Sequence, residues 1–127
     1  MIKLIMIDDN PMEHLIIQRR LQRYKIFSDA EHSMNGRITI EFLRSHATDI
    51  SALPDLIFLD LNMPDFSGWD FLKQFELLRG SLSKQISIYI MSSSIDEQDK
   101  KAVGQYLFVK EFISKPISKE KLEQLYS

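Results

Sequence analysis

The feature that most constrains the fold of this chain is an alternation of short apolar runs with longer amphipathic stretches. Three runs are almost continuously apolar and two are weaker; they cover residues 3–7, 56–59 and 87–91, then 26–32 and 110–113. Continuous apolar runs of this length are typical of parallel strands that are covered on both faces. The alternation therefore predicts βαβ units around a parallel sheet.

Helix signals lie between these runs. Asn10 predicts an N-cap, Pro11 fits the first helical position, and Glu13 completes a capping box. Four further helices are predicted. The first covers residues 37–43, and the second has the apolar stripe of Phe71, Leu72, Phe75 and Leu78. The third begins with a capping box of Ser94 and Glu97, and the fourth begins with a cap at Ser118.

Five strands and five helices in alternation predict an α/β fold with right-handed crossovers. We expect a doubly wound, flavodoxin-like (βα)5 sandwich whose five-stranded parallel sheet has the order 2-1-3-4-5. The length fits one core, and no linker or repeat divides the chain, so residues 1–127 are expected to form a single domain without an output domain. Ligands of such sheets bind beyond the carboxyl ends of the strands.

Composition excludes several classes of function. The chain carries 16 basic and 18 acidic residues without a dense Lys/Arg block, which argues against direct contact with nucleic acid. It has no cysteine, so disulfides and thiolate metal sites are excluded. No apolar stretch is long enough for a signal peptide or a membrane span. We therefore expect a soluble, cytoplasmic protein with no membrane contact.

Polar residues directly follow four of the predicted strands: Asp8 and Asp9, Asp60, Ser92 and Lys115. If the first and third strands are neighbours, the three carboxylates converge at one edge of the sheet. Two carboxylates about 4 Å apart repel by about 4 kcal/mol at an effective dielectric constant near 20. The cluster therefore needs a counter-charge, and a divalent cation would supply it.

Oxygen ligands without cysteine favour Mg2+, whose coordination is commonly completed by waters and a substrate phosphate. Asp60 then has the setting of a carboxylate nucleophile that forms an aspartyl phosphate. Lys115 and the Ser92 hydroxyl would meet the phosphoryl oxygens from the other side. The pattern predicts phosphoryl transfer.

A family resemblance supports this prediction. It rests on Asp8-Asp9, the run DLIFLDLNMP at 55–64, Gly68, the three serines at 92–94 and Lys115-Pro116. These residues resemble the receiver domains of response regulators in two-component signalling, in particular the stand-alone, chemotaxis-regulator-like receivers. The resemblance spans nearly the whole chain.

The resemblance implies a role for each matching residue. Asp60 would be the phosphoacceptor, Asp9 and Asp60 would bind Mg2+ directly, Asp8 would act through a metal-bound water, and the backbone carbonyl of Asn62 would be a further ligand. Lys115 would bind the phosphoryl group.

The resemblance also implies how the switch would work. Ser92 would be the hydroxyl that moves toward the phosphoryl group, and Phe112 the aromatic residue whose rotamer follows that move. The side chains of Asn62 and Ser94 would influence how long the phosphoryl group lasts.

Two positions depart from the family pattern. Ser92 stands where threonine is more common, which keeps the hydroxyl and loses a stiffening methyl group. Phe108-Val109 replaces the small Gly-Ala pair usual before the fifth strand, so the exit from the fourth helix is expected to differ.

The function implied is a phosphorelay switch that receives its phosphoryl group from a histidine kinase or a histidine phosphotransfer protein. It catalyses its own phosphorylation and dephosphorylation and turns over no external substrate. Output would be through binding of an unidentified downstream protein, by the face formed by residues 94–127.

Two other classes remain open. A constitutive interaction module would keep the fold without phosphotransfer, but it would normally lack one of the acids or the lysine. A hydrolase of the haloacid-dehalogenase type would need an acid two residues after Asp8, where Asn10 stands. His14, His32 and His46 have no companion at ligand spacing, so no chemical role is predicted for them.

Overall fold

Strands and helices alternate along the chain, as predicted. The computed structural model describes residues 2–94 and 96–127. Its elements are β1 (Leu4–Ile7), α1 (Pro11–Tyr24), β2 (Glu31–Ser33), α2 (Gly36–Ser45), β3 (Leu56–Asp60), α3 (Gly68–Leu78), the 3-10 turn η1 (Arg79–Ser81), β4 (Ser87–Ser92), α4 (Glu97–Val103), β5 (Val109–Ser114) and α5 (Lys119–Tyr126).

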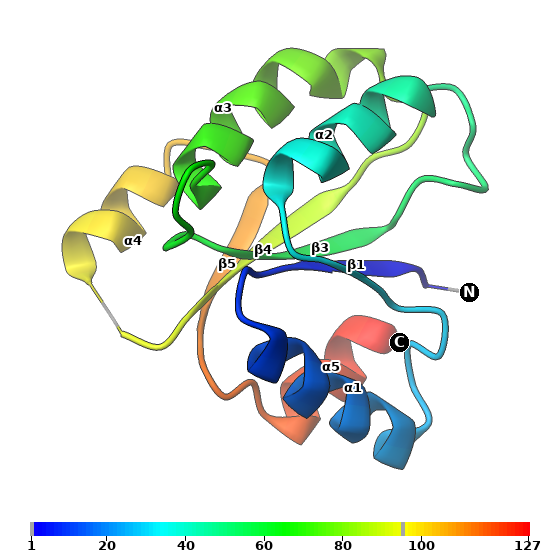
Figure 1. Cartoon of the computed structure of the whole chain (residues 1–127), viewed down its shortest axis with the longest axis vertical. Helices are drawn as coiled ribbons and strands as arrows, with labels where there is room; N and C mark the ends of the chain where they lie inside the picture. The colour runs from blue at the N-terminus through cyan, green and yellow to red at the C-terminus, as the bar shows by residue number, and fades with distance from the viewer. Residues whose placement is uncertain (1, 95) are drawn as a thin grey trace.

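The five strands are parallel and form one sheet in the order β2-β1-β3-β4-β5. Helices α1 and α5 cover one face of the sheet, and α2, α3 and α4 lie on the other side (Figure 1). The predicted doubly wound, flavodoxin-like fold is confirmed. Within the described ranges, no helix combines the length and apolar character that crossing a membrane requires.

The central strands are buried on both faces, which explains their continuous apolar sequence. In β1, Leu4 and Met6 pack with the side of α1 and α5, whereas Ile5 and Ile7 pack with the side of α2 and α3. All four side chains are at most 5% exposed. Successive residues of a strand point to opposite faces, so each central strand contributes to both cores.

The second strand begins later than predicted. It comprises Glu31–Ser33 instead of residues 26–32. The N–H of Ile26 still bonds to the carbonyl of Leu21 at the end of α1, and Phe27 follows with a φ of 47°. Both side chains are buried in the core on the α1 side. Ile26 and Phe27, the apolar pair that suggested a strand, therefore belong to the turn by which the chain leaves α1.

Two predicted capping boxes are wrong. Asn10 caps α1 through its side chain as predicted, but its own N–H donates to the Asp8 carboxylate, 2.9 Å away, and not to Glu13. Helix α4 is capped by Asp96, which accepts from the N–H groups of Gln98 and Asp99, and not by Ser94. The predicted cap at Ser118 is confirmed, since its hydroxyl accepts from the N–H of Lys121.

Gly68 fixes how α3 approaches the end of β3. Its N–H donates to the carbonyl of Leu61, 3.1 Å away. A Cβ atom at Gly68 would lie 2.5 Å from the carbonyl oxygen of Asp60 and 2.6 Å from the Cα of Leu61. Both contacts are with backbone, which has little freedom to move aside. The absence of a side chain thus lets the helix pack directly behind Asp60.

We expect Gly68→Ala to lower the free energy of unfolding by about 2–3 kcal/mol, because the added methyl group forces the backbone behind Asp60 to shift. Gly80→Ala is the matched control, since a Cβ there meets nothing within 4 Å, and it should change stability by less than about 1 kcal/mol. Urea unfolding measures both. Equal losses in the two variants would contradict the close approach at Gly68.

Candidate functional site

The acidic residues predicted to converge do lie together at the carboxyl edge of the sheet. β1 and β3 are hydrogen-bonded neighbours with Ile7 opposite Leu59, so Asp8 and Asp60 follow side by side. One carboxylate oxygen from each of Asp8, Asp9 and Asp60 lies within 4.8 Å of the others. Asp8 is 2% exposed and Asp60 is 9% exposed. The three carboxylates therefore form one cluster in which Asp8 and Asp60 are buried and Asp9 is half-buried.

Lys115 supplies a positive charge to this cluster. Its ammonium nitrogen lies 2.9 Å from a carboxylate oxygen of Asp8 and 3.9 Å from one of Glu13. The Lys115 backbone N–H donates to the carbonyl of Ser92, 2.7 Å away, which fixes the end of β5 beside the end of β4. The ion pair thus joins the first and last strands of the chain.

The local electrostatics differ between Asp60 and Lys115. Burial raises the pKa of Asp60, and the charges of Asp8 and Asp9 act in the same direction, against Lys115 and the N–H of Asn62. Burial acts to lower the pKa of Lys115, but the hydrogen bond and charge of Asp8, with Asp60 and Glu13, outweigh it and hold that pKa above its usual value. One ammonium therefore does not fully compensate three acids.

The predicted serines lie at the end of β4. The Ser92 side chain is 5% exposed, and its hydroxyl donates to the carbonyl of Ser94 at 2.6 Å, while the Ser94 N–H donates back to that hydroxyl at 3.3 Å. Asn62 lies on the neighbouring loop, and its N–H donates to the Asp60 carboxylate at 3.4 Å. Ser94 and Asn62 are exposed, so both are accessible at the rim of the site.

Phe112 lies on β5, opposite Ile90 of β4, and is half-buried. Its ring packs against the core on the side of α2 and α3. Trp69 is also half-buried against this core, as expected for a packing residue near the start of α3. This packing does not test whether the Phe112 rotamer follows Ser92, so that role stays a prediction.

Two histidines make a contact that the sequence did not predict. The Nδ1 atoms of His14 and His32 are 2.7 Å apart, and the Nε2 of His14 lies 2.7 Å from the carbonyl oxygen of Asp8. His14 therefore donates to the backbone of the acidic pair. Burial and the nearby His14 lower the pKa of His32. The spacing of these two histidines along the sequence did not indicate the contact, because the contact depends on where β2 begins.

The donor set fits a hard divalent cation. Carboxylate oxygens are the ligands that Mg2+ and Ca2+ prefer. The three carboxylate oxygens lie within 4.8 Å of one another, so they are close enough to bind one ion together. Asp8, Asp9 and Asp60 could each offer an oxygen to such an ion, and one oxygen of Asp8 also contacts Lys115.

Comparisons with known proteins agree with this geometry. The family model of the response regulator receiver domain matches residues 4–127. A protein described as "Probable methanogenesis regulatory protein FilR2", from Methanothrix harundinacea, is 25% identical over 122 residues, which are 95% of this chain and 76% of that protein. A protein-glutamate methylesterase/protein-glutamine glutaminase of Treponema denticola is 30% identical over 94% of this chain but only 30% of its own length.

Solved structures show the same fold. A two component response regulator from Cytophaga hutchinsonii superposes with a TM-score of 0.79 at 22% identity, covering 98% of this chain and 92% of that one. The chemotaxis protein CheY4 of Vibrio cholerae superposes with a TM-score of 0.75 at 20% identity, covering 98% and 95%. Since the receiver model matches all but the first three residues, the chain belongs to the family of response regulator receiver domains.

Proposed function

We propose that this chain is a phosphorylation switch in which Asp60 accepts a phosphoryl group in the presence of Mg2+. The observation that carries the proposal is the meeting of three carboxylates within 4.8 Å, with the ammonium of Lys115 bound to one of them. A constitutive interaction module would have no need for a buried acidic cluster, which costs stability unless it is compensated.

The donor would be a phosphohistidine of a histidine kinase or of a histidine phosphotransfer protein. A carboxylate oxygen of Asp60 attacks the phosphorus, a P–O bond forms, and the P–N bond breaks with its electron pair returning to the imidazole nitrogen. Mg2+ held by Asp9, Asp60 and the carbonyl of Asn62, and through water by Asp8, would neutralise charge on the phosphoryl oxygens.

Lys115 and Ser92 would bind the phosphoryl group once it is on Asp60. Lys115 would exchange part of its contact with Asp8 for a phosphoryl oxygen, since all three groups lie at the same edge. The Ser92 hydroxyl would give up its bond to the Ser94 carbonyl to donate to the phosphoryl group. This exchange would free the Ser94 carbonyl in the loop before α4.

Hydrolysis would return the switch to its resting state. A water oxygen attacks the phosphorus, the bond to Asp60 breaks, and the products are the Asp60 carboxylate and inorganic phosphate. Asn62 and Ser94 are both exposed at the rim, where their side chains would control the access of that water. The protein would act in this way on itself and turn over no external substrate.

Output would be through binding of a downstream protein by the face that α4, β5 and α5 form. Phe112 of this face would follow the movement of Ser92, because both lie at or beside the β4–β5 pairing. The protein would act in the cytoplasm as a receiver domain and would signal by altered partner binding, as phosphorylation-driven two-state elements do.

Incubation with acetyl phosphate and Mg2+ should add one phosphoryl group to the wild-type chain, seen by intact mass and lost in base. Asp60→Asn should gain none, because it removes the nucleophile. Asp65→Asn is the matched control, an exposed acid of the same loop, and it should be phosphorylated like the wild type. A chelator should abolish the gain in all samples. Phosphorylation of Asp60→Asn would exclude Asp60 as the acceptor.

The free energy of unfolding should show whether Mg2+ binds beside Asp60, without any phosphoryl donor. In chelator, Asp60→Asn should be more stable than wild type by about 1 kcal/mol, because it removes one of three clustered carboxylates. Mg2+ at about one hundred times its Kd should stabilise the wild type by about 2.7 kcal/mol, and Asp60→Asn should lose most of that gain. Urea unfolding measures both differences. An equal response of both proteins to Mg2+ would place the ion elsewhere.

A further inference from the structure

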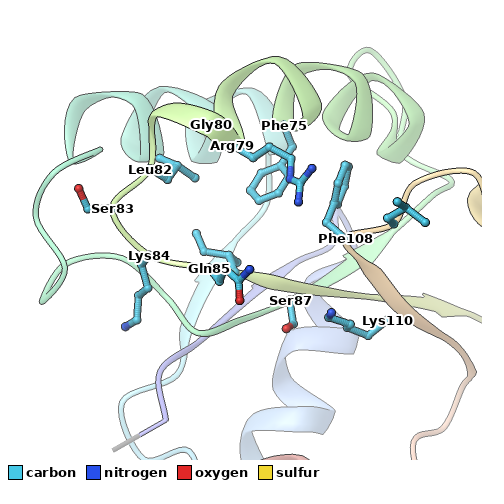
Figure 2. Close-up of a pocket in the computed structure, with 12 residues that line it drawn as sticks. Phe75, Arg79, Gly80, Leu82, Ser83, Lys84, Gln85, Ser87, Phe108 and Lys110 are labelled. Atoms are coloured by element: carbon cyan, nitrogen blue, oxygen red, sulfur yellow. The ribbon is translucent and has the colours of Figure 1, made fainter.

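Polar side chains outside the carboxylate cluster converge at one place, directly behind Asp8. The cavity of about 530 Å³ at the amino end of β4 is different, because its charged residues Arg79 and Lys110 lie on opposite sides of the strand and do not meet at one ligand (Figure 2). Behind Asp8, the end of β1, the first turn of α1 and the edge strand β2 come together through hydrogen bonds of His14 and His32.

His14 is the donor to Asp8 at this junction. Its side chain is 8% exposed, and its Nε2 lies 2.7 Å from the carbonyl oxygen of Asp8. A carbonyl oxygen only accepts hydrogen bonds, so the Nε2 of His14 carries a proton. The bond is buried, and it ties the residue that follows β1 to the first turn of α1.

His32 holds the ring of His14 from the other side. The two Nδ1 atoms are 2.7 Å apart, and the rings meet edge to face with their centres 4.8 Å apart. A neutral imidazole carries one proton, which in His14 is on Nε2, so the Nδ1 of His14 accepts and the Nδ1 of His32 donates. The contact with β2 therefore selects the tautomer of His14 that can donate to Asp8.

Gln18 extends this chain of hydrogen bonds along α1. The Nε2 of His32 lies 2.7 Å from the side-chain amide oxygen of Gln18. In a neutral pair this Nε2 accepts, and a half-turn of the amide brings the NH2 group of Gln18 there to donate. The chain thus runs from the surface of α1, through both histidines, to the backbone of the acidic pair.

The Asp8 carbonyl belongs to the peptide group that joins the two acids. The other groups of Asp8 are also fixed, since its N–H donates to the carbonyl of Ser33 and its carboxylate accepts from the N–H of Asn10 and from Lys115. For Asp9, no cation lies within 4 Å of its carboxylate in residues 2–94 and 96–127. Because a peptide group is planar, holding its carbonyl also fixes the Cα atom of Asp9.

We propose that His14 is a positioning residue of the acidic site. Its Nε2–H holds the peptide between Asp8 and Asp9, which keeps the Asp9 carboxylate beside that of Asp60, and His32 keeps the ring in the donating tautomer. The inference rests on the proposed Mg2+ site, because the carboxylates that His14 positions are the candidate ligands.

The hydrogen bonds are tested first in chelator, at about pH 8, which is above the usual histidine pKa of about 6.5. Long-range 1H–15N spectra of the imidazole rings should show the proton of His14 on Nε2 and that of His32 on Nδ1. The 13C shift of the Asp8 carbonyl should change in His14→Phe and stay near the wild-type value in His14→Gln, whose amide keeps a donor at similar reach. A His14 ring with its proton on Nδ1 alone would overturn the proposal.

Mg2+ affinity is then measured from the amide shifts of residues 8–9 and 60–62. His14→Phe should weaken Mg2+ binding about tenfold, the effect of losing one buried hydrogen bond, and His14→Gln should bind within about threefold of the wild type. His46→Phe is the matched control, because it also removes a histidine bond to a backbone carbonyl, that of Phe42 at 2.9 Å, but at the end of α2. It should bind Mg2+ like the wild type.

Equal Mg2+ affinity of His14→Phe and wild type, or an equal loss in His14→Phe and His46→Phe, would contradict the positioning role. A wild-type chain without Mg2+ shifts at residues 8–9 and 60–62 would refute the proposed metal site itself, and the metal-free shift of the Asp8 carbonyl distinguishes that result from a failure at His14 alone. Should the amide spectra show that His14→Phe is unfolded, His32→Phe replaces it. That variant should show a second tautomer of His14 and about threefold weaker Mg2+ binding.

Discussion

The arrangement of the site depends on the ion pair between Lys115 and Asp8 and on the repulsion among three clustered carboxylates, two of which are buried. The pair joins residues 107 positions apart, with a nitrogen-oxygen distance of 2.9 Å. Burial raises the pKa of Asp60, and the negative charges of Asp8 and Asp9 raise it further, against the opposing charge of Lys115. The fold therefore holds together groups that would separate in an unfolded chain, and a bound cation would relieve that repulsion.

The parallel sheet explains how these groups meet. The carboxyl ends of β1, β3, β4 and β5 lie at the same edge of the sheet. Asp8, Asp60, Ser92 and Lys115 stand at these ends or directly after them, so they come to one edge without a long loop. The packing behind them is close, as the approach of Gly68 to the Asp60 backbone shows.

Much of the fold and of the candidate site could be predicted from the sequence, because both depend on local signals. Continuous apolar runs predicted β1, β3 and β4, and the acids directly follow the first two of these runs. The rest depends on contacts between distant segments. Ile26 and Phe27 are apolar because they are buried after the end of α1, although the same pattern is typical of a strand. Asp96 and not Ser94 caps α4, because the helix begins at Glu97, directly after Asp96. The contact of His14 with His32 could not be predicted, since it follows from the register of β2 beside β1.

The most direct test of the central claim is the anomalous diffraction of crystals soaked in Mn2+, which takes the same oxygen ligands as Mg2+. The account predicts one strong peak about 2.1 Å from carboxylate oxygens of Asp9 and Asp60 and from the Asn62 carbonyl, with Lys115 still beside Asp8. A peak at another acidic cluster, or a soaked crystal with no peak beside Asp60, would contradict it. In either case the acidic edge would not be the cation site on which phosphoryl transfer depends.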